Sequence, residues 1–188
     1  MLILKVLNRS KRLIWAILWK TYFLFNRKSA TKTVVISPRS IIGLRYINFG
    51  NNIRILGGAR LEVYQLEPYN AKIEIGDNVS INYDVHIGCV NKIIIGHGAL
   101  IASGVFITDH FHGDPHAPAN AVSYSTLELV SPGPVIIGEN CWIGEKVSIM
   151  PNVAIGAGSI IGANSVVTKS FPPKSVIAGV PAKLLRQK

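Results

Sequence analysis

Cysteine and charge are both scarce in this sequence of 188 residues. Only Cys89 and Cys141 occur, without a Cys-x-x-Cys or Cys/His zinc spacing, so we expect neither a disulfide framework nor a bound metal. Charged residues make up 16% of the chain and hydrophobic residues 48%, which excludes intrinsic disorder. The length predicts one main domain, and the two isolated cysteines favour a reducing compartment, the cytoplasm.

Acidic residues are absent from the first 33 positions, which carry eight basic residues. The whole chain has 20 Lys and Arg against 10 Asp and Glu, a formal charge of +10. Leaving out residues 1–33, 12 basic and 10 acidic residues remain, a net charge of only +2. Nucleic-acid binding needs a basic face on the folded domain, so we predict no nucleic-acid partner.

Hydrophobic runs long enough to span a membrane are missing as well. The apolar stretch from Leu13 to Phe25 is interrupted by Lys20 and falls short of the roughly 20 residues that cross a bilayer. It lacks the small-residue cleavage site that follows a signal peptide. We therefore predict that residues 1–33 form a basic amphipathic helical segment. Two roles stay open for it: peripheral contact with the inner face of the membrane, or packing on this domain or a neighbouring subunit.

Isoleucine and valine are abundant, and they recur with a period of six. Ile (26) and Val (17) outnumber Leu (15), which favours strands over helices. A six-residue period fits neither a helix nor hairpin strands and is typical of short parallel strands separated by tight turns, so residues 34–188 are predicted to form an all-β parallel β-helix. The repeated positions are Ile137, Ile143, Ile149, Ile155, Ile161 and Val167, then Ile75, Ile81, Ile87 and, after a two-residue slip, Ile95, Ile101, Ile107, with a weaker echo at Ile41, Ile47 and Ile53.

The C-terminal repeats resemble a known family, the hexapeptide-repeat acyltransferases. The signature of that family is similar to residues 135–186, which read VIIGENCWIGEKVSIMPNVAIGAGSIIGANSVVTKSFPPKSVIAGVPAKLLR. Within the family, the chain looks most like the acetyl-CoA-dependent O-acetyltransferases of polysaccharide and lipopolysaccharide pathways. The resemblance implies a left-handed coil with three hexapeptides per turn, acetyl-CoA as co-substrate, and a homotrimer with active sites between subunits. The implied acceptor is a sugar hydroxyl of a cell-surface polysaccharide, lipopolysaccharide or lipid-linked glycan precursor.

The repeat disappears between Ile107 and Val135, so residues 108–134 are predicted to form a loop excursion rich in Pro, Gly and His. Members of the family carry their catalytic histidine where such a loop leaves a strand, a position that His110 occupies here. A neutral imidazole can accept the proton of an attacking hydroxyl, so the resemblance implies direct acetyl transfer with His110 as general base. His112 is the second candidate, because residues two apart on a strand share a face.

Polar residues near the predicted base are candidates for acceptor binding. Asn82 lies where related enzymes keep a polar residue that binds the acceptor, and Asp84 is close to it in sequence. Both could instead be corner residues that form local turns. Asp109 is expected only to support His110, because neighbours in sequence often point apart. His86 alternates with apolar residues and is left without a role.

The resemblance implies that the C-terminal coils bind the coenzyme. Trp142 looks like an aromatic residue that lies beside the catalytic histidine and the pantetheine arm, unless it fills a subunit contact. Small residues at coil turns would let pantetheine approach the backbone, and cations would meet the phosphates, although a solvated tail would have the same charges. The residues concerned are Ala102, Gly144 and Ala163 for pantetheine, and Thr168, Lys169, Lys183 and Arg186 for adenine and the 3′-phosphate.

Other functions stay open at this point. N-acetylation of an amino sugar uses the same donor and a similar base, and a non-catalytic β-helix scaffold could carry the same repeat. A zinc enzyme would need three converging imidazoles, which these histidines are not spaced to provide, and both cysteines adjoin core positions rather than a reactive site. Related enzymes with small acceptors begin with a helical cap, where this chain has residues 1–33. That departure, together with the roomy excursion, favours a lipid-linked or polymeric acceptor.

Overall fold

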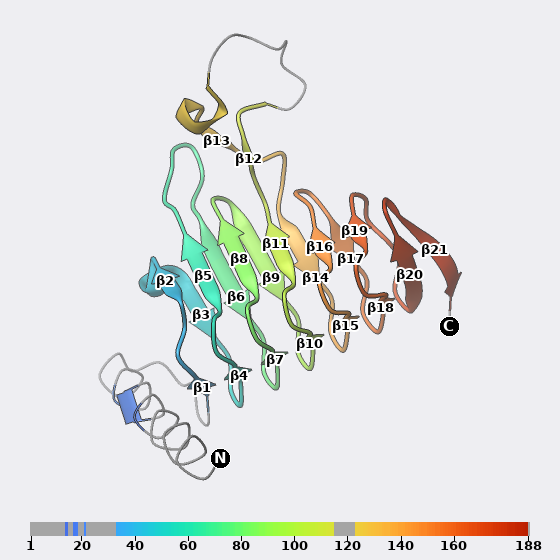
Figure 1. Ribbon diagram of the computed structural model, residues 1–188, viewed down its shortest axis with the longest axis horizontal. Coiled ribbons are helices and arrows are strands. Elements are labelled where there is room, and N and C mark those ends of the chain that lie inside the picture. The colour runs from blue at the N-terminus through green and yellow to red at the C-terminus, as the bar shows by residue number, and fades with distance from the viewer. Residues whose placement is uncertain (1–13, 15–16, 19–20, 22–32, 115–122, 188) are drawn as a thin grey trace, which may run out of the picture.

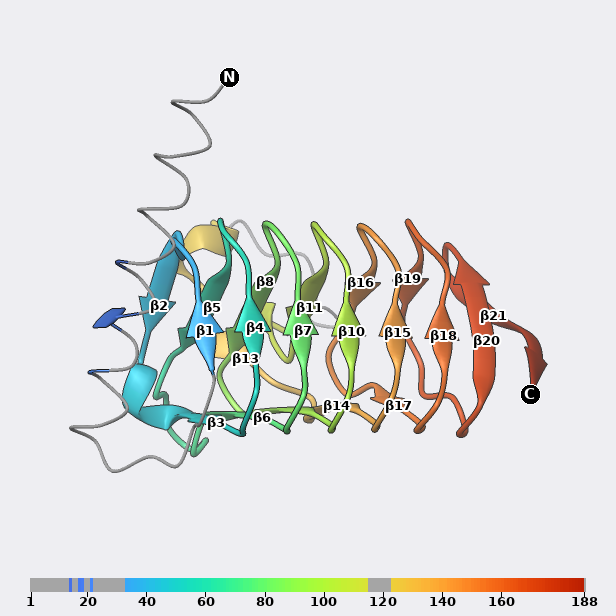
Figure 2. The ribbon, with the colours of Figure 1, turned by 90° about the horizontal axis from the view of Figure 1, so that it is seen from below.

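The computed structural model describes residues 14, 17–18, 21, 33–114 and 123–187, whose strands wind into a solenoid (Figure 1). After each strand the chain turns a corner into the next of three sheets, here named A, B and C, and returns to sheet A one coil later. Within each sheet, strands of successive coils pair in parallel, and the strands of sheet A form a regular row in Figure 2. These findings confirm the predicted all-β class built from parallel strands.

The sheets differ in their number of strands. Sheet A contains β1 (Val34–Val35), β4 (Arg54–Ile55), β7 (Ser80–Ile81), β10 (Leu100–Ile101), β15 (Trp142–Ile143), β18 (Ile160–Ile161), β20 (Ser175–Gly179) and β21 (Ala182–Gln187). Sheet B contains β2 (Ser40–Ile42), β5 (Arg60–Val63), β8 (His86–Cys89), β11 (Phe106–Thr108), β16 (Ser148–Ile149) and β19 (Val166–Val167). Sheet C contains β3 (Ile47–Phe49), β6 (Lys72–Ile75), β9 (Lys92–Ile95), β14 (Val135–Ile137) and β17 (Ala154–Ile155).

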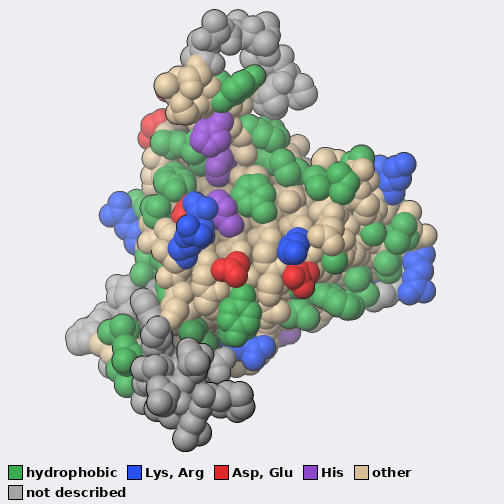
Figure 3. All heavy atoms as spheres, viewed as in Figure 1, with side chains coloured by type: hydrophobic (Ala, Val, Ile, Leu, Met, Phe, Trp, Pro, Cys, Tyr) green, Lys and Arg blue, Asp and Glu red, His purple; other side chains and the backbone are tan. Residues whose placement is uncertain are grey.

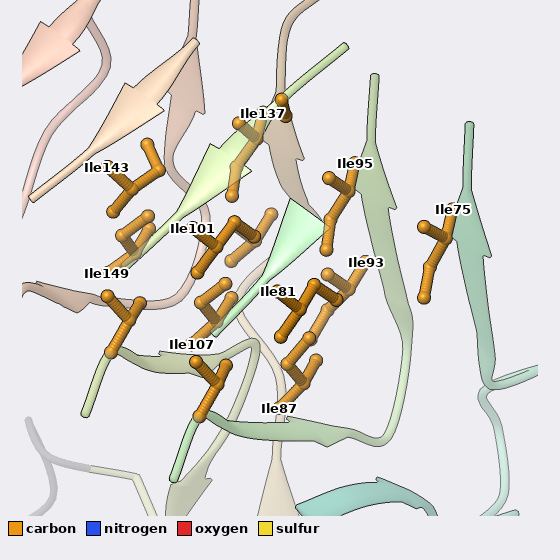
Figure 4. Packing of buried hydrophobic residues seen from close by; sticks show 14 of the residues in the cluster. Ile75, Ile81, Ile87, Ile93, Ile95, Ile101, Ile107, Ile137, Ile143 and Ile149 are labelled. Carbon is orange, nitrogen blue, oxygen red and sulfur yellow. The ribbon is translucent and has the colours of Figure 1, made fainter. Parts of the chain in front are cut away.

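Columns of branched aliphatic side chains fill the interior (Figure 4). The inward residues of each strand, one in the two-residue strands of sheet A and two in a strand such as β6, lie beside their equivalents in the next coil, because the strands pair in register. Ile81, Ile101 and Ile143 form such a column in sheet A. All three are fully buried. The six-residue positions of the sequence are therefore the inward-facing ones, and the period equals one side of the coil.

The corners need a backbone conformation that few residues adopt. Five asparagines have φ between 54° and 60°, in the left-handed region. Asparagine tolerates this region better than most residues because its short polar side chain hydrogen-bonds locally. These asparagines lie at turns between strands: Asn52, Asn78, Asn140, Asn152 and Asn164.

The predicted excursion leaves sheet B after β11 and rejoins the coil at β14. It is not a loop throughout, because β12 (Phe111–His112) pairs antiparallel with β13 (Leu129–Val130), and a short 3-10 helix, η2 (Tyr124–Thr126), precedes β13. This pair corrects the expectation of an irregular segment over 108–134: backbone groups that leave the coil satisfy one another. His116 lies outside the described residues.

A second insertion, residues 64–71 between β5 and β6, did not stand out in the sequence. It packs against the base of the excursion, where the Tyr69 hydroxyl accepts a hydrogen bond from the backbone N–H of Ser131 at 3.0 Å. A third irregularity is the two-residue slip, which falls between β8 and β9. All three interrupt the same corner, from sheet B to sheet C, in successive coils.

The two ends of the chain depart from the coil. At the C-terminus, β21 turns back and pairs antiparallel with β20, so that it covers the edge of sheet A. Near the N-terminus, the 3-10 helix η1 (Leu44–Tyr46) precedes β3. The predicted helical segment 1–33 lies almost wholly outside the described residues; Thr21 within it donates to the carbonyl of Ile17 at 2.9 Å. Among the helices that the structure describes, none is long and apolar enough to cross a membrane.

The alternation of inward and outward residues predicts unequal costs for neighbouring substitutions. Ile137 is fully buried, whereas Ile136 on the same strand is 38% exposed. We expect Ile137→Ala to lower the free energy of unfolding by about 2–5 kcal/mol. Ile136→Ala, the matched control, should lower it by about 0.5 kcal/mol. Urea unfolding of both variants measures the difference, and equal losses would contradict the assignment of the core face.

Candidate active site

A cavity of about 450 Å³ opens at the corner between sheets B and C, beside the excursion. One wall is the outer face of β5, β8 and β11, and the other comes from β12 and β13. Histidine side chains gather on this face, at the base of the excursion (Figure 3). The lining residues are Arg60, Glu62, Tyr64, His86, Gly88, Phe106, Thr108, His110, Phe111, His112, Leu129 and Met150.

His110 lies between β11 and β12, one residue after Asp109, and lines this cavity. Its Nδ1 lies 3.0 Å from Oδ1 of Asp109 and 3.2 Å from Oγ1 of Thr108. A hydrogen on Nδ1 that is donated to the Asp109 carboxylate leaves Nε2 as the acceptor nitrogen of the neutral ring. The side chain of Asp109 is 0% exposed and that of His110 13%. A buried carboxylate thus orients an imidazole that can take up a proton from the cavity side.

The Asp109 carboxylate binds His110 and also the backbone of residues 90–91, which form the two-residue slip in the preceding coil. The backbone N–H of Val90 donates to Oδ1 at 2.9 Å, that of Asn91 to Oδ2 at 2.8 Å, and the Cys89 thiol to Oδ2 at 3.3 Å. Burial by itself raises the pKa of Asp109, but the hydrogen bonds from His110 and from these groups outweigh it and hold the pKa below its ordinary value. Asp109 therefore has a larger part in the site than the sequence indicated.

A second buried carboxylate, which sequence reasoning missed, lies on the wall formed by β5. Glu62 is 4% exposed and accepts two hydrogen bonds from the Arg60 guanidinium, from Nε to Oε1 and from Nη2 to Oε2, both at 3.0 Å. The Tyr64 hydroxyl donates to Oε2 at 3.2 Å. Burial raises the pKa of Glu62, but hydrogen bonds from Arg60 and Ser40 hold it below its ordinary value. The sequence signal that could have found this site is the spacing of Arg60, Glu62 and Tyr64, because residues two apart on a strand share one face.

His86 completes this group from the neighbouring strand β8. Its Nε2 lies 3.3 Å from Oε2 of Glu62, and its ring packs against Phe106 with centroids 5.2 Å apart. Burial lowers the pKa of His86, the Arg60 charge lowers it further, and Glu62 only partly offsets them, so the ring is neutral near pH 7. We refer to Arg60, Glu62, Tyr64 and His86 as the Glu62 cluster.

The other predicted acceptor residues are divided between this cavity and a different corner. His112 lines the cavity from β12. Asn82 and Asp84 lie at the corner from sheet A to sheet B, where Asn82 N–H donates to the carbonyl of Ile101 at 2.9 Å and Asp84 has φ 56°. Within one chain, neither residue lines the cavity that contains His110.

Residues predicted to bind the donor gather at that same A-to-B corner. Asn82, Ala102 and Gly144 each follow the inward residue of a sheet A strand, and the N–H of each donates to a carbonyl of the next coil. Gly144 has no room for a side chain, since a Cβ there would lie 2.7 Å from the backbone nitrogen of Ala163. Trp142, 51% exposed, lies on the outer face of β15. We refer to Ala102, Trp142, Gly144 and Ala163 as the donor edge.

The remaining predicted donor residues lie at the C-terminal end of the solenoid. Thr168 and Lys169 follow β19 and are exposed, with Lys169 Nζ 5.7 Å from the ring centroid of Phe171. Lys183 and Arg186 are exposed on β21. The cationic side chains of this group therefore border solvent at one end of the coil.

The cysteines and the metal alternative can be assessed from the same geometry. Cys89 and Cys141 are buried, and burial raises the pKa of both thiols, which opposes formation of the nucleophilic thiolate. Over residues 33–114 and 123–187, no three His, Cys, Asp or Glu side chains are grouped so that they could hold a metal ion.

Comparison with known proteins gives matches in sequence and in structure. The family described as bacterial transferase hexapeptide (six repeats) matches residues 134–169. WbbJ of Escherichia coli K12, named as a lipopolysaccharide biosynthesis O-acetyl transferase, is 43% identical over 147 residues, which cover 75% of this chain and 71% of WbbJ. A galactoside acetyltransferase solved in complex with coenzyme A is 39% identical, with a TM-score of 0.55, over 61% of this chain and 55% of that one.

The fold also matches AntD, an N-acyltransferase from Bacillus cereus solved with dTDP and 3-hydroxybutyryl-CoA. The TM-score is 0.73 over 89% of this chain and 88% of that one, at 21% identity, so this likeness concerns the fold alone. Together, the repeat fold and the matches in sequence define an enzyme that transfers acyl groups. The chain belongs to the hexapeptide-repeat acyltransferase family, and it is an acetyltransferase.

The buried Asp109 predicts a stability that depends on pH. Because its folded pKa lies below the unfolded value of about 3.9, its contribution is fully present above that value and is lost as pH falls through the folded pKa. Asp109→Asn should lower the free energy of unfolding by about 1–3 kcal/mol at neutral pH. The difference from the wild type should shrink below about pH 4. Urea unfolding across this pH range measures it, and a difference that does not change with pH would contradict the assignment.

Proposed function

We propose that this protein transfers the acetyl group of acetyl-CoA to a sugar hydroxyl. The observation that carries the proposal is His110, whose Nδ1 is bound by the buried Asp109 while its ring lines a cavity with polar and aromatic walls. The relative WbbJ, named as an O-acetyl transferase of lipopolysaccharide biosynthesis, supports an oxygen acceptor on a glycan. The acceptor is accordingly a cell-surface polysaccharide, a lipopolysaccharide or a lipid-linked precursor.

The chemistry requires one base and no covalent intermediate. Nε2 of His110 takes the proton of the acceptor hydroxyl as its oxygen bonds to the thioester carbonyl carbon. The carbon–sulfur bond then breaks, and the imidazolium returns the proton to the departing thiolate of coenzyme A. Because a thiolate is a good leaving group, direct transfer suffices, and backbone N–H groups stabilise the oxyanion. Asp109 keeps His110 in the required tautomer and favours the imidazolium that forms.

A homotrimer accounts for the separation of donor and base. In one chain, the donor edge lies at the corner from sheet A to sheet B, where the strands of sheet B begin, and the His110 cavity lies at the corner from sheet B to sheet C, where they end. In a trimer of left-handed coils, which the family resemblance implies, the donor edge of one subunit faces the cavity of its neighbour. Asn82 and Asp84, beside the donor edge, then reach the acceptor from the second subunit. The adenine and phosphates of the coenzyme are assigned to Thr168, Lys169, Lys183 and Arg186.

The proposed use of acetyl-CoA also implies where in the cell this protein acts. Acetyl-CoA is used in the cytoplasm, and a glycan precursor is assembled on the inner face of the membrane. Contact of residues 1–33 with that face stays a prediction, supported by their eight basic residues and the lack of acidic ones. Loss of membrane association and of activity on a lipid-linked acceptor after deletion of residues 1–33 would support it, and retention of both would contradict it.

The proposed base predicts a selective loss of activity. We expect His110→Ala to lower kcat by about 10²–10⁴-fold, because the hydroxyl then loses its proton acceptor. His97→Ala, which removes an exposed corner histidine, is the matched control and should leave kcat unchanged. Release of free thiol from acetyl-CoA is followed with a panel of glycosides and amino sugars. Wild-type activity in His110→Ala would contradict the mechanism, and an alkali-stable amide product would favour N-acetylation over O-acetylation.

The donor edge predicts a separate effect on coenzyme binding. We expect coenzyme A to bind in the micromolar range, on the order of −8 kcal/mol, and Trp142→Ala to weaken binding about tenfold. His110→Ala should bind it as the wild type does. Isothermal titration of each variant, with the assembly measured by sedimentation, tests this. A folded trimer that does not bind coenzyme A at about millimolar concentration would contradict the assignment of the donor edge.

A further inference from the structure

Gly88 occupies a position in β8 where glycine is not needed for the backbone conformation. It pairs with Glu62 in the preceding coil and with Thr108 in the next one. Its φ lies outside the left-handed region. Glycine weakens the interior of a strand and often marks a place where a ligand or another backbone approaches closely. The absence of a side chain here therefore calls for an explanation in terms of space.

The space above Gly88 lies between two imidazoles. A Cβ at Gly88 would lie 3.3 Å from Cε1 and 4.0 Å from Nε2 of His110, and 3.6 Å from Nε2 of His86. Both rings therefore already contact the position of that Cβ, and the missing side chain leaves room for the His110 ring. His110 is held at Nδ1 by Asp109, whereas Nε2 of His86 is the nitrogen that contacts Glu62. Nε2 of His110 and the Glu62 cluster thus lie close enough together to contact one sugar ring.

The Glu62 cluster has the chemistry of a hydroxyl-binding site. The Glu62 carboxylate already contacts Arg60, Tyr64 and His86, and it holds Arg60 by two bonds that leave further guanidinium N–H groups unused and able to donate to a hydroxyl. The charges of Arg60 and Glu62 cancel, so the cluster does not favour an anionic group. Phe106 and Phe111 line the same cavity and offer apolar surfaces to a sugar ring. A neutral sugar suits this combination better than an acidic one.

We propose that the Glu62 cluster binds a second hydroxyl of the acceptor, adjacent to the one that His110 deprotonates. This inference rests on the proposed function and narrows the substrate class to a neutral sugar that presents a vicinal diol at the site of acetylation. Arg60, Glu62, Tyr64 and His86 are then residues that determine which acceptor is used, and Gly88 lets the His110 ring lie beside them.

The test compares sugars that differ by one hydroxyl. Methyl glycosides of galactose, glucose and mannose are assayed by thiol release, and the acetylated position is mapped on the product. The analogue that lacks the hydroxyl next to that position should lose about 10- to 100-fold in kcat/KM, the range expected when a hydrogen bond to a charged group is removed. An analogue deoxygenated elsewhere on the ring, the control sugar, should lose less than about threefold.

Variants link this preference to the cluster. Glu62→Gln should lower kcat/KM for the diol glycoside by about 10- to 100-fold but change that of the neighbouring-deoxy analogue by less than about threefold. Glu74→Gln is the matched control, because Glu74 is a carboxylate held by Lys72 and Lys92 on the outer face of sheet C. It should leave both values unchanged. A general structural defect would lower the values for both sugars together, so the ratio between them is the informative quantity.

Gly88→Ala tests the space directly. The added methyl group would lie 3.3 Å from Cε1 of His110, so it should displace the base and lower kcat/KM for the glycoside by about tenfold or more, while the affinity for coenzyme A stays at the wild-type value. Gly57→Ala is the control, because a Cβ at Gly57 would meet no atom closer than 3.8 Å. Thermal unfolding of both variants reports whether they fold. Unchanged kcat/KM in a folded Gly88→Ala protein would contradict the close approach of His110 to the Glu62 cluster and would overturn the inference.

The outcomes separate this inference from the proposed function. If glycosides are acetylated but Glu62→Gln lowers kcat/KM equally for the diol and deoxy sugars, the inference fails and the proposed function stands. If the protein binds coenzyme A but acetylates no glycoside, the proposed acceptor class fails, and the inference fails with it. Loss of the neighbouring-deoxy penalty in Glu62→Gln alone supports both.

Discussion

The hydrogen bonds between successive coils determine the place of nearly every side chain in this protein. Each strand pairs in register with its equivalent one coil away, so the aliphatic columns stay continuous only if each side of the coil keeps its length. Extra residues can therefore be added only at a corner. Three successive coils add them at the same corner, as residues 64–71, the slip after β8 and the excursion after β11. Tyr64 of the first insertion and Phe111, His112 and Leu129 of the excursion line the cavity.

Asp109 shows how such an irregularity becomes part of a site. The slip leaves the N–H groups of Val90 and Asn91 outside the regular ladder, and the buried carboxylate accepts both. Since a buried charge is tolerated only when it is well hydrogen-bonded, the slip and the carboxylate depend on each other. The same carboxylate binds Nδ1 of His110. One carboxylate therefore satisfies the N–H groups of the slip and also orients the imidazole of His110.

The charges at the cavity differ from those of the chain as a whole. The net charge of +10 is concentrated in residues 1–33, whereas the cavity is lined by the Glu62 carboxylate, Arg60 and a neutral imidazole at His86, with the buried Asp109 carboxylate behind His110. Each carboxylate is matched by hydrogen-bond donors, Glu62 by Arg60 of its own strand and Asp109 by the backbone of the slip between β8 and β9. Because the charges at the site are matched, little net potential remains to favour a charged ligand over an uncharged acceptor.

The sequence by itself determined the all-β class, the inward-facing residues, the excursion and the position of His110, because a hexapeptide period is a local property and every break in it is visible along the chain. It did not reveal Glu62, His86 or the part played by Asp109, since these residues look like ordinary polar positions within the repeat. Only the tertiary structure decided them. Coil stacking brings residues some 20 positions apart into contact, and whether a polar side chain there finds a partner depends on both coils at once.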